Sequence, residues 1–407
     1  MSSSAGKRKK HVLMLLENAG IPEDHRVVKE AVALIELGFD VSIICPTCPG
    51  QRWREDVQGI EVYRFPASFS PKGFLGYVWE YSYSLVMFKW ISLYLLVRRG
   101  FDVVHVHTPP DLTAIVAVFY QIVFRKRFVF DHHDLSPELY MARKGEEAKP
   151  NAVYKVLRWF ERLACSRADR LIATNGTQQN VQIHRAGAKA ENCHIVRNGP
   201  NDAFLRDVEP RQELLRPGRL VLGYVGIIGV QDGVDYVLRV VEKLKNQFQR
   251  RDFLAVIVGY GPELEEIKKL AIEMGLSDEV MFTGKVLFPE VPPYIAAFDI
   301  CLTPDPSNAY NDSCTTIKTM EYMSLRKPTV CFRTTENEVT AGQSALYADN
   351  NDVESYAQQV IRLMDDPHLR KQMGQIARER IQAGLTWQHQ RAVLEKLYLS
   401  LFPDVST

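Results

Sequence analysis

The sequence has almost no net charge and few cysteines, and each shortage excludes a class of protein. Its 50 basic and 49 acidic residues leave a formal charge of +1, whereas a protein that wraps nucleic acid normally carries a strong basic excess. Seven cysteines in 407 residues are too few for a disulfide scaffold. The apolar run at 12–16, after the first basic residues, is too short for a secretory signal. We therefore expect reduced thiols and a cytoplasmic protein.

Two familiar nucleotide-binding signatures are also missing. The glycine-rich stretch at 223–233 lacks the Gly-Lys-Ser/Thr ending of a P-loop, and it lacks the spacing of the dinucleotide fingerprint. The adjacent His132 and His133 point to opposite sides of an extended chain, which suits two ligands of one ion poorly. We therefore expect no metal and no cofactor.

Short apolar runs alternate with helical patterns, and this alternation occurs twice along the chain. The expected strands are 11–16, 41–45, 60–65, 102–107, 127–131, 171–174 and 194–196 in the first half, and 220–225, 253–258, 280–283, 300–303 and 329–332 in the second. Such alternation predicts parallel sheets covered by helices on both faces. The predicted fold class is α/β, with two Rossmann-like domains facing each other across a cleft. We expect domains at 1–200 and 201–384, and a C-terminal helix within 385–407 that returns to the first domain.

Residues 74–97 differ from the rest, since they contain eight aromatic residues and only two charged ones, Glu80 and Lys89. A spanning helix needs about 20 predominantly apolar residues, and the two charges and several serines argue against one here. Two interpretations remain open: a helix that lies on a membrane surface, or a helix buried against its own sheet.

Candidate binding residues lie just after the strands, because open parallel sheets bind ligands beyond the carboxyl ends of their strands. In the first half, His107 follows one strand, and the polar cluster Asp131-His-His-Asp-Leu-Ser-Pro-Glu138 follows the next. The position of His133 in this cluster favours a functional role over a structural one.

In the second half, Gly226 and Gly229 follow one strand, and Gly259 and Gly261 follow another. Glycine turns before a helix let backbone N–H groups approach a phosphate.

A third site is Asn311-Asp-Ser-Cys-Thr-Thr-Ile-Lys-Thr-Met-Glu321. Thr315, Thr316 and Lys318 at a helix start are suited to a diphosphate, and Glu321 to the hydroxyls of a ribose. The alternative is a surface Lys–Glu pair.

These motifs resemble the retaining glycosyltransferases of the GT-B fold, family 4, over nearly the whole chain. The similar segments are EDHRVVKEAVALIELGFDVSIIC, FDVVHVHTPPDL, FVFDHHDLSPEL, HIVRNGPNDAF, GYVGIIGVQDGVDYVL, VIVGYGPELEEIKKLA, VMFTGKV, FDICLTP and SCTTIKTMEYMSLRKPTV. Within the family, the resemblance is strongest to bacterial enzymes that build O-antigen, capsule or exopolysaccharide on a polyprenyl diphosphate.

The resemblance implies roles for individual residues. It implies that Glu321 binds the donor ribose, that His133 is the active-site histidine and that Gly20 belongs to a loop beside the sugar and phosphates. The turns at 259–262 and 283–286 would frame the nucleotide. The full set of expected residues is His133, Glu321 and Lys318 as catalytic; Gly20, Gly226, Gly229, Gly259, Gly261, Lys285, Ser313, Thr315 and Thr316 on the donor side; and His107, Asp134, Glu138 and Arg26 on the acceptor side.

The chain departs from the family pattern at three positions. Ser313 replaces the first glutamate of the Glu-x7-Glu motif, and Ile227 and Asp232 stand where the family has a phosphate-binding arginine and lysine. Positive charge at the phosphates must therefore come from elsewhere, and Lys318 is the candidate. These changes indicate either a subfamily with another donor or a loss of activity.

The resemblance implies a metal-independent retaining hexosyl- or N-acetylhexosaminyltransferase. It would move a sugar from a nucleotide diphosphate sugar, with uridine as the expected base, to a lipid-linked saccharide in surface polysaccharide biosynthesis. It would be cytoplasmic or peripheral on the plasma membrane through residues 74–99, and it would not bind nucleic acid. The alternatives are a GT-B nucleotide-sugar epimerase and a non-catalytic sugar-nucleotide-binding scaffold.

Overall fold

The structure is a computed structural model that describes residues 8–68, 74–145 and 149–402. The described residues form two compact units. The first comprises those within 1–140, 149–196 and 390–407, and the second those within 141–148 and 197–389.

The first unit is built on an eight-stranded sheet with the order β3-β4-β2-β1-β5-β6-β7-β8. Its strands are β1 (His11–Leu15), β2 (Asp40–Pro46), β3 (Arg54–Val57), β4 (Ile60–Phe65), β5 (Val103–His107), β6 (Arg127–His132), β7 (Arg170–Ala173) and β8 (Cys193–Ile195). All neighbours run parallel except β3 and β4. The sequence did not predict β3, because Arg-Glu-Asp-Val has no apolar pattern; a charged strand is tolerated at a sheet edge.

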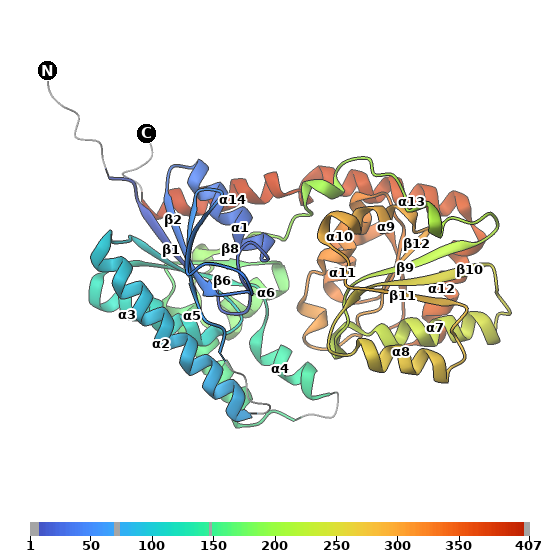
Figure 1. The fold of residues 1–407 in the computed structure, drawn as a ribbon, viewed down its shortest axis with the longest axis horizontal. Helices are drawn as coiled ribbons and strands as arrows, with labels where there is room; N and C mark the ends of the chain where they lie inside the picture. Colours follow the sequence, from blue (N-terminus) through green and yellow to red (C-terminus); the bar gives the residue numbers. More distant parts are fainter. Residues whose placement is uncertain (1–7, 69–73, 146–148, 403–407) are drawn as a thin grey trace, which may run out of the picture. The chain divides into compact units, whose positions relative to one another are not determined.

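Helices cover both faces of this sheet (Figure 1). They are α1 (His25–Glu36), α2 (Phe74–Arg98), α3 (Ala114–Phe124), α5 (Ala152–Arg167), α6 (Gly176–Asn180) and most of the C-terminal α14 (Trp387–Leu401). A further helix, α4 (Ser136–Lys144), begins in this unit and ends among residues of the second. Asp24 caps α1 by accepting hydrogen bonds from the backbone N–H groups of Arg26 and Val27. The helix buries Val27, Ala31 and Leu34, as its period predicts, but the same face also buries Glu30 completely. A buried carboxylate on an otherwise apolar face needs a polar partner.

The second unit is built on a six-stranded parallel sheet with the order β11-β10-β9-β12-β13-β14. Its strands are β9 (Leu220–Ile227), β10 (Phe253–Tyr260), β11 (Val280–Gly284), β12 (Ile300–Thr303), β13 (Thr329–Phe332) and β14 (Ala345–Ala348). Its helices are α7 (Val234–Asn246), α8 (Leu264–Glu273), α9 (Val291–Ala297), α10 (Ile317–Ser324), α11 (Thr335–Ala341), α12 (Val353–Asp365) and α13 (Pro367–Arg380).

Two parallel-sheet units with helices on both faces confirm the predicted α/β class of two Rossmann-like domains. Segments β14, α12 and α13 were not predicted, although Asp352 caps α12 as a sequence signal would suggest.

The aromatic segment forms α2, and one of its faces is buried against its own sheet, as one of the two interpretations expects. One face buries Phe88, Ile91 and Leu95 in the core of the first unit, whereas Trp79 and Trp90 are exposed. None of the helices in the described part of the chain is long and apolar enough to cross a bilayer.

Candidate active site

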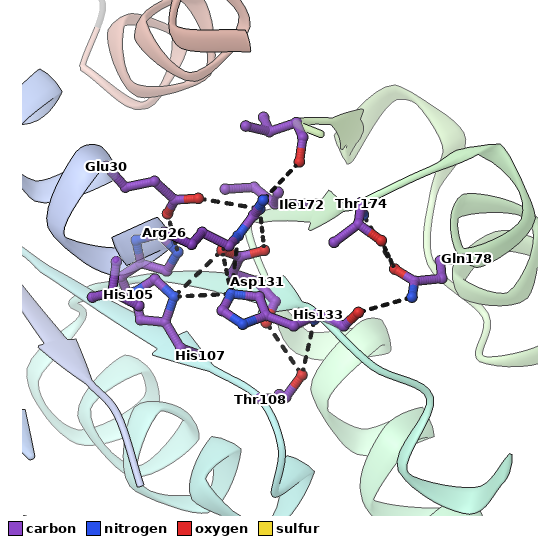
Figure 2. A network of polar contacts seen from close by, with 12 residues as sticks. Arg26, Glu30, His105, His107, Thr108, Asp131, His133, Ile172, Thr174 and Gln178 are labelled. Atoms are coloured by element: carbon purple, nitrogen blue, oxygen red, sulfur yellow. Dashed lines mark hydrogen bonds and ion pairs between the residues drawn. The ribbon is translucent and has the colours of Figure 1, made fainter. Parts of the chain in front are cut away.

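Asp131 is the centre of a buried polar network at the carboxyl end of β6 (Figure 2). Arg26 Nη2 donates to Asp131 Oδ1 at 2.9 Å, and His133 Nε2 lies 2.8 Å from Asp131 Oδ2. Burial alone would raise the pKa of Asp131, but the positive charge of Arg26 and the contact with His133 hold it well below its usual range. The ionised carboxylate and the Arg26 guanidinium, whose Nε lies 3.2 Å from His133 Nε2, together hold the Nε2 edge of the His133 ring.

The backbone of His133 is held as firmly as its ring. Its N–H donates to Thr108 Oγ1 at 3.2 Å, and Gln178 Nε2 donates to its carbonyl at 2.8 Å. Thr174 Oγ1 donates in turn to Gln178 Oε1 at 2.6 Å. The side chain of His133 is 12% exposed, whereas that of Asp131 is fully buried. The network thus fixes His133 at the carboxyl end of β6. Thr108, Thr174 and Gln178 had no recognisable signal in the sequence.

Four ligand-type side chains below His133 form the kind of group that binds a metal ion. Single ligand atoms of Glu30, His105, His107 and Asp131 all lie within 4.8 Å of one another. However, the guanidinium of Arg26 lies 3.1 Å from Glu30 and 2.9 Å from Asp131, so a cation already lies against both carboxylates. Burial, reinforced by the charge of Asp131, raises the pKa of Glu30 well above its usual range, although Arg26 opposes this shift. The residues therefore fit a charge-neutral internal network better than a metal site.

Three of the four expected acceptor-side residues are buried in structural contacts. Arg26 is bound to Asp131 as described above, and His107 is fully buried, which lowers its pKa. Glu138 accepts two hydrogen bonds from Arg185, at 2.5 and 3.0 Å. We therefore assign these three side chains to holding the site in place. Asp134 is partly exposed beside His133.

Glu17, which is not among the predicted site residues, lies just beyond β1, at the same carboxyl end of the sheet as His133. Ser84 Oγ on α2 donates to its Oε1 at 2.9 Å. Burial raises the pKa of Glu17 to about 7, and the nearby charge of Glu80 adds to the shift. The position of Glu17 directly after the first expected strand is the sequence signal that could have identified it.

We expect the pKa of Glu17 to shape the pH dependence of stability. The folded state holds this proton more tightly than the unfolded state, so its stabilising effect is complete below pH ~4.5 and disappears as the pH rises past 7. Urea unfolding from pH 4.5 to 8 should show that Glu17→Gln gains about 3 kcal/mol relative to the wild type over this range. Parallel pH profiles for the two proteins would contradict the assignment.

In the second unit, Lys318 is the charged centre of the candidate donor site. It lies on α10, is 8% exposed, and donates from Nζ to both oxygens of Asp305 at 2.9 and 3.1 Å. Asp232 Oδ1 lies 3.8 Å from the same ammonium. Burial raises the pKa of Asp232 to about 6, although Lys318 opposes this shift. The positive charge of Lys318 is therefore already balanced by carboxylates.

The glycine turns bring backbone segments close together. A Cβ atom at Gly259 would lie 1.9 Å from the carbonyl oxygen of Gly226, and one at Gly261 would lie 2.3 Å from the carbonyl oxygen of Ile228. The N–H of Gly229, which the sequence predicted to face a phosphate, donates to Asp232 Oδ2 at 3.1 Å. Close packing of the β9 and β10 ends thus accounts for Gly259 and Gly261. A Cβ atom at Gly20, in the first unit, would lie 3.0 Å from Cys48 Sγ.

The hydroxyl groups before and within the first turn of α10 already have partners in the second unit. These contacts are Ser313 Oγ to Tyr310 O (2.7 Å), Thr315 Oγ1 to Glu336 Oε2 (3.3 Å) and Thr316 Oγ1 to Thr319 Oγ1 (2.9 Å). Glu321 is 9% exposed, so Lys318 and Glu321 are not the surface pair that the sequence left open.

Lys285 differs from Lys318, because it is exposed at the end of β11. Its Nζ lies 4.9 Å above the ring of Tyr260, which is 45% exposed at the end of β10. The structure therefore places an accessible cation at the carboxyl edge of this sheet.

A cavity of about 580 Å³ lies at the opposite edge of the sheet. It is lined by residues 215–220, before and at the start of β9, with Asp252, Asp299 and Met364. The amino ends of parallel strands are not where such sheets bind ligands, so this cavity is not the candidate site.

Two family profiles match the chain in the order of its units. The profile described as "Glycosyl transferase 4-like domain" matches residues 25–199, and the one described as "Glycosyl transferases group 1" matches residues 219–366. The chain belongs to the family 4 type of GT-B glycosyltransferases. The resemblance recognised in the sequence is confirmed.

The relatives of this glycosyltransferase are themselves described as glycosyltransferases, with different descriptions. One is an alpha-D-kanosaminyltransferase of Streptomyces kanamyceticus, 27% identical over 54% of this chain and 58% of its own length. Another is an uncharacterized glycosyltransferase of Methanocaldococcus jannaschii, 21% identical over 88% of this chain and 90% of its own. The chain therefore spans little more than half of the first relative and most of the second.

Solved structures share the fold of this glycosyltransferase. Sucrose-phosphate synthase from Thermosynechococcus elongatus has a TM-score of 0.81 at 19% identity and covers 97% of this chain and 100% of its own. Anabaena HepE, solved in complex with UDP and glucose, has a TM-score of 0.73 at 16% identity over 96% and 100%. These likenesses support the two-domain GT-B fold.

Proposed function

We propose that this protein is a retaining glycosyltransferase that moves a sugar from a nucleotide diphosphate sugar to a lipid-linked saccharide. The proposed sugar is a hexosyl or N-acetylhexosaminyl group, the proposed base is uridine and the proposed setting is surface polysaccharide biosynthesis. The observation that carries the proposal is His133, fixed through Asp131 at the strand edge where this family has its active-site histidine. The UDP complex of HepE, a protein of the same fold, supports the choice of a nucleotide sugar.

The donor would bind at the carboxyl edge of the second sheet. Lys285 supplies an accessible positive charge there, and the amino end of α10 supplies backbone N–H groups and a partial positive charge. Lys318 also lies there, but Asp305 binds its ammonium at 2.9 Å, so it would act on the diphosphate only together with this carboxylate partner. Glu321 is the proposed partner of the ribose hydroxyls.

In the proposed reaction, the bond between the anomeric carbon and the diphosphate oxygen breaks while the acceptor oxygen attacks from the same face. Negative charge grows on the departing diphosphate, where fixed N–H groups and cations stabilise it. The acceptor proton passes to the departing phosphate. His133 would hydrogen-bond to the donor sugar as positive charge develops on the ring. Asp131 and Glu30 are buried beside Arg26, so neither is presented as a covalent nucleophile.

The proposed acceptor is a polyprenyl diphosphate-linked saccharide, which places the enzyme at the cytoplasmic face of the plasma membrane, held there through residues 74–99. We propose that no metal ion is needed, because Arg26 already neutralises the one cluster of metal-type ligands found among the described residues.

Release of nucleoside diphosphate tests this function and separates it from the alternatives. Purified protein is incubated with candidate sugar nucleotides, with and without membrane lipid extract, and with and without EDTA. Release that requires extract and resists EDTA supports the transferase. Conversion of the sugar nucleotide alone would indicate an epimerase, and binding without turnover would indicate a scaffold.

Variants of the donor site complete the test. We expect Glu321→Ala and Lys318→Ala each to lower the rate of release at least tenfold, because both side chains lie in the proposed donor site. Lys269→Ala is the control, since Lys269 is 68% exposed on α8 and forms only a helix-surface pair with Glu273. If both donor-site variants keep the wild-type rate, the assigned site is wrong.

A further inference from the structure

The exposed face of α2 carries a continuous apolar stripe. Trp79, Val86, Trp90 and Val97 are 55%, 51%, 66% and 87% exposed. Their spacings of seven, four and seven residues place them on one side of a helix. Large apolar side chains gathered in this way on a protein surface mark an interaction site.

Helix α3 carries a second stripe of the same kind. Ile115, Phe119, Ile122 and Val123 are 39%, 37%, 62% and 55% exposed, and their spacings of four, three and one again share one helix face. The opposite face, with Ala117 and Tyr120, is buried. The helix is therefore apolar on its exposed side as well as on its buried one, with Gln121 and the Tyr120 hydroxyl as its polar side-chain groups, and such exposure is unusual for a soluble protein.

The two helices are neighbours in the first unit. Ser92 of α2 and Tyr120 of α3 share a buried hydrogen bond of 2.7 Å between their hydroxyl oxygens. Figure 1 shows α2 and α3 side by side on the same face of the sheet. The two exposed stripes therefore lie on adjacent helices of the same unit.

Cationic side chains accompany this apolar surface. Lys89 and Arg98 are exposed on α2, and Arg125 is exposed directly after α3. Lys126 and the half-exposed Arg127 follow, and Arg127 is paired with Asp169 at 3.3 Å. Within the described residues of the two helices, Glu80 is the one acidic side chain. The basic run at 125–127 thus lies at the end of the helix that carries the second apolar stripe, which the sequence alone did not indicate.

We infer that α2 and α3 together form a docking surface for a bilayer that contains anionic lipids, with the α3 stripe and Arg125 as essential parts of it. This inference rests on the proposed function and extends the membrane contact beyond residues 74–99. Aromatic and apolar side chains enter the boundary between headgroups and acyl chains, while lysine and arginine bind the anionic headgroups.

Charge decides between a bilayer and a second copy of this chain. A two-fold dimer through the same surface would bring identical cationic rims together, and the like charges would repel. Anionic headgroups present the opposite charge.

Vesicle flotation tests the inference, using phosphatidylcholine vesicles with and without phosphatidylglycerol. We expect the wild type to float with the anionic vesicles, Ile122→Ser/Val123→Ser to lower the bound fraction at least tenfold, and Arg125→Glu to weaken binding to anionic vesicles only. The matched controls are Ile272→Ser and Lys269→Glu on α8 of the second unit, whose side chains are 69% and 68% exposed. Both controls should float like the wild type.

Two results would overturn the inference: flotation that the α3 variants leave unchanged, or a wild type that stays unbound and forms dimers that Ile122→Ser/Val123→Ser dissociates. Nucleoside diphosphate release with detergent-solubilised extract separates this inference from the proposed function. The α3 variants should release nucleoside diphosphate from detergent-solubilised substrate at the wild-type rate. A wild type without this activity would contradict the proposed function. An active wild type that does not float with anionic vesicles would contradict the docking surface.

Discussion

Asp131→Ala is expected to lower the free energy of unfolding by about 3–5 kcal/mol, because it leaves a buried arginine without its main counter-charge. Arg26 Nη2 donates to Asp131 Oδ1 at 2.9 Å, and burial raises the pKa of its other carboxylate neighbour, Glu30, which makes Glu30 the weaker counter-charge. The same variant removes the group that orients His133. Urea unfolding, followed by circular dichroism, measures the loss.

Asp207→Ala is the matched control for this prediction. The side chain of Asp207 is 90% exposed in its pair with Arg326, so its removal should change stability by less than about 1 kcal/mol. A second comparison uses the double variant Arg26→Leu/Asp131→Leu, which should cost less than the sum of the two single variants, since neither charge is left alone. Equal losses for Asp131→Ala and Asp207→Ala would mean that the network is not buried as described.

His133→Ala is expected to lower kcat about 100- to 1,000-fold, the usual loss when one fixed polar group that stabilises a transition state is removed. Its stability should stay close to that of the wild type, because the side chain is at the edge of the network and Arg26 still neutralises Asp131. Steady-state release of nucleoside diphosphate and a thermal melt on the same samples separate the two effects.

His184→Ala, at an exposed position of the first unit, is the control and should leave both measurements unchanged. If His133→Ala lowers stability by as much as Asp131→Ala while a residual folded fraction keeps normal kcat, His133 is structural.

Most of the fold could be predicted from the sequence. Every strand expected from an apolar run has a counterpart in the two sheets, with ends that differ by at most two residues, as β1 and β9 illustrate. The fold class and the family resemblance are confirmed. The strand β3 was missed because its charged residues carry no apolar period, and only the neighbouring β4 gives it hydrogen-bond partners.

The location of the candidate site could be predicted from the sequence, whereas the contacts of its side chains could not. The polar cluster after β6 was recognised, since it directly follows an apolar strand. The same reasoning assigned Arg26, His107 and Glu138 to the acceptor, whereas all three are committed to internal partners. Likewise, Lys318 was expected to supply charge to a phosphate, and its pairing with Asp305 was not foreseen.

By itself, the sequence determined which segments are strands and helices, which family the chain belongs to and at which strand ends polar groups gather. These properties depend on local periodicity and on motifs that occupy contiguous residues. Only the tertiary structure decided which polar groups neutralise one another and which remain exposed, because partners such as Arg26 and Asp131 are separated by 105 positions in the chain. It also decided that α2 and α3 lie together with their apolar stripes uncovered, since exposure depends on what the rest of the fold leaves unpacked.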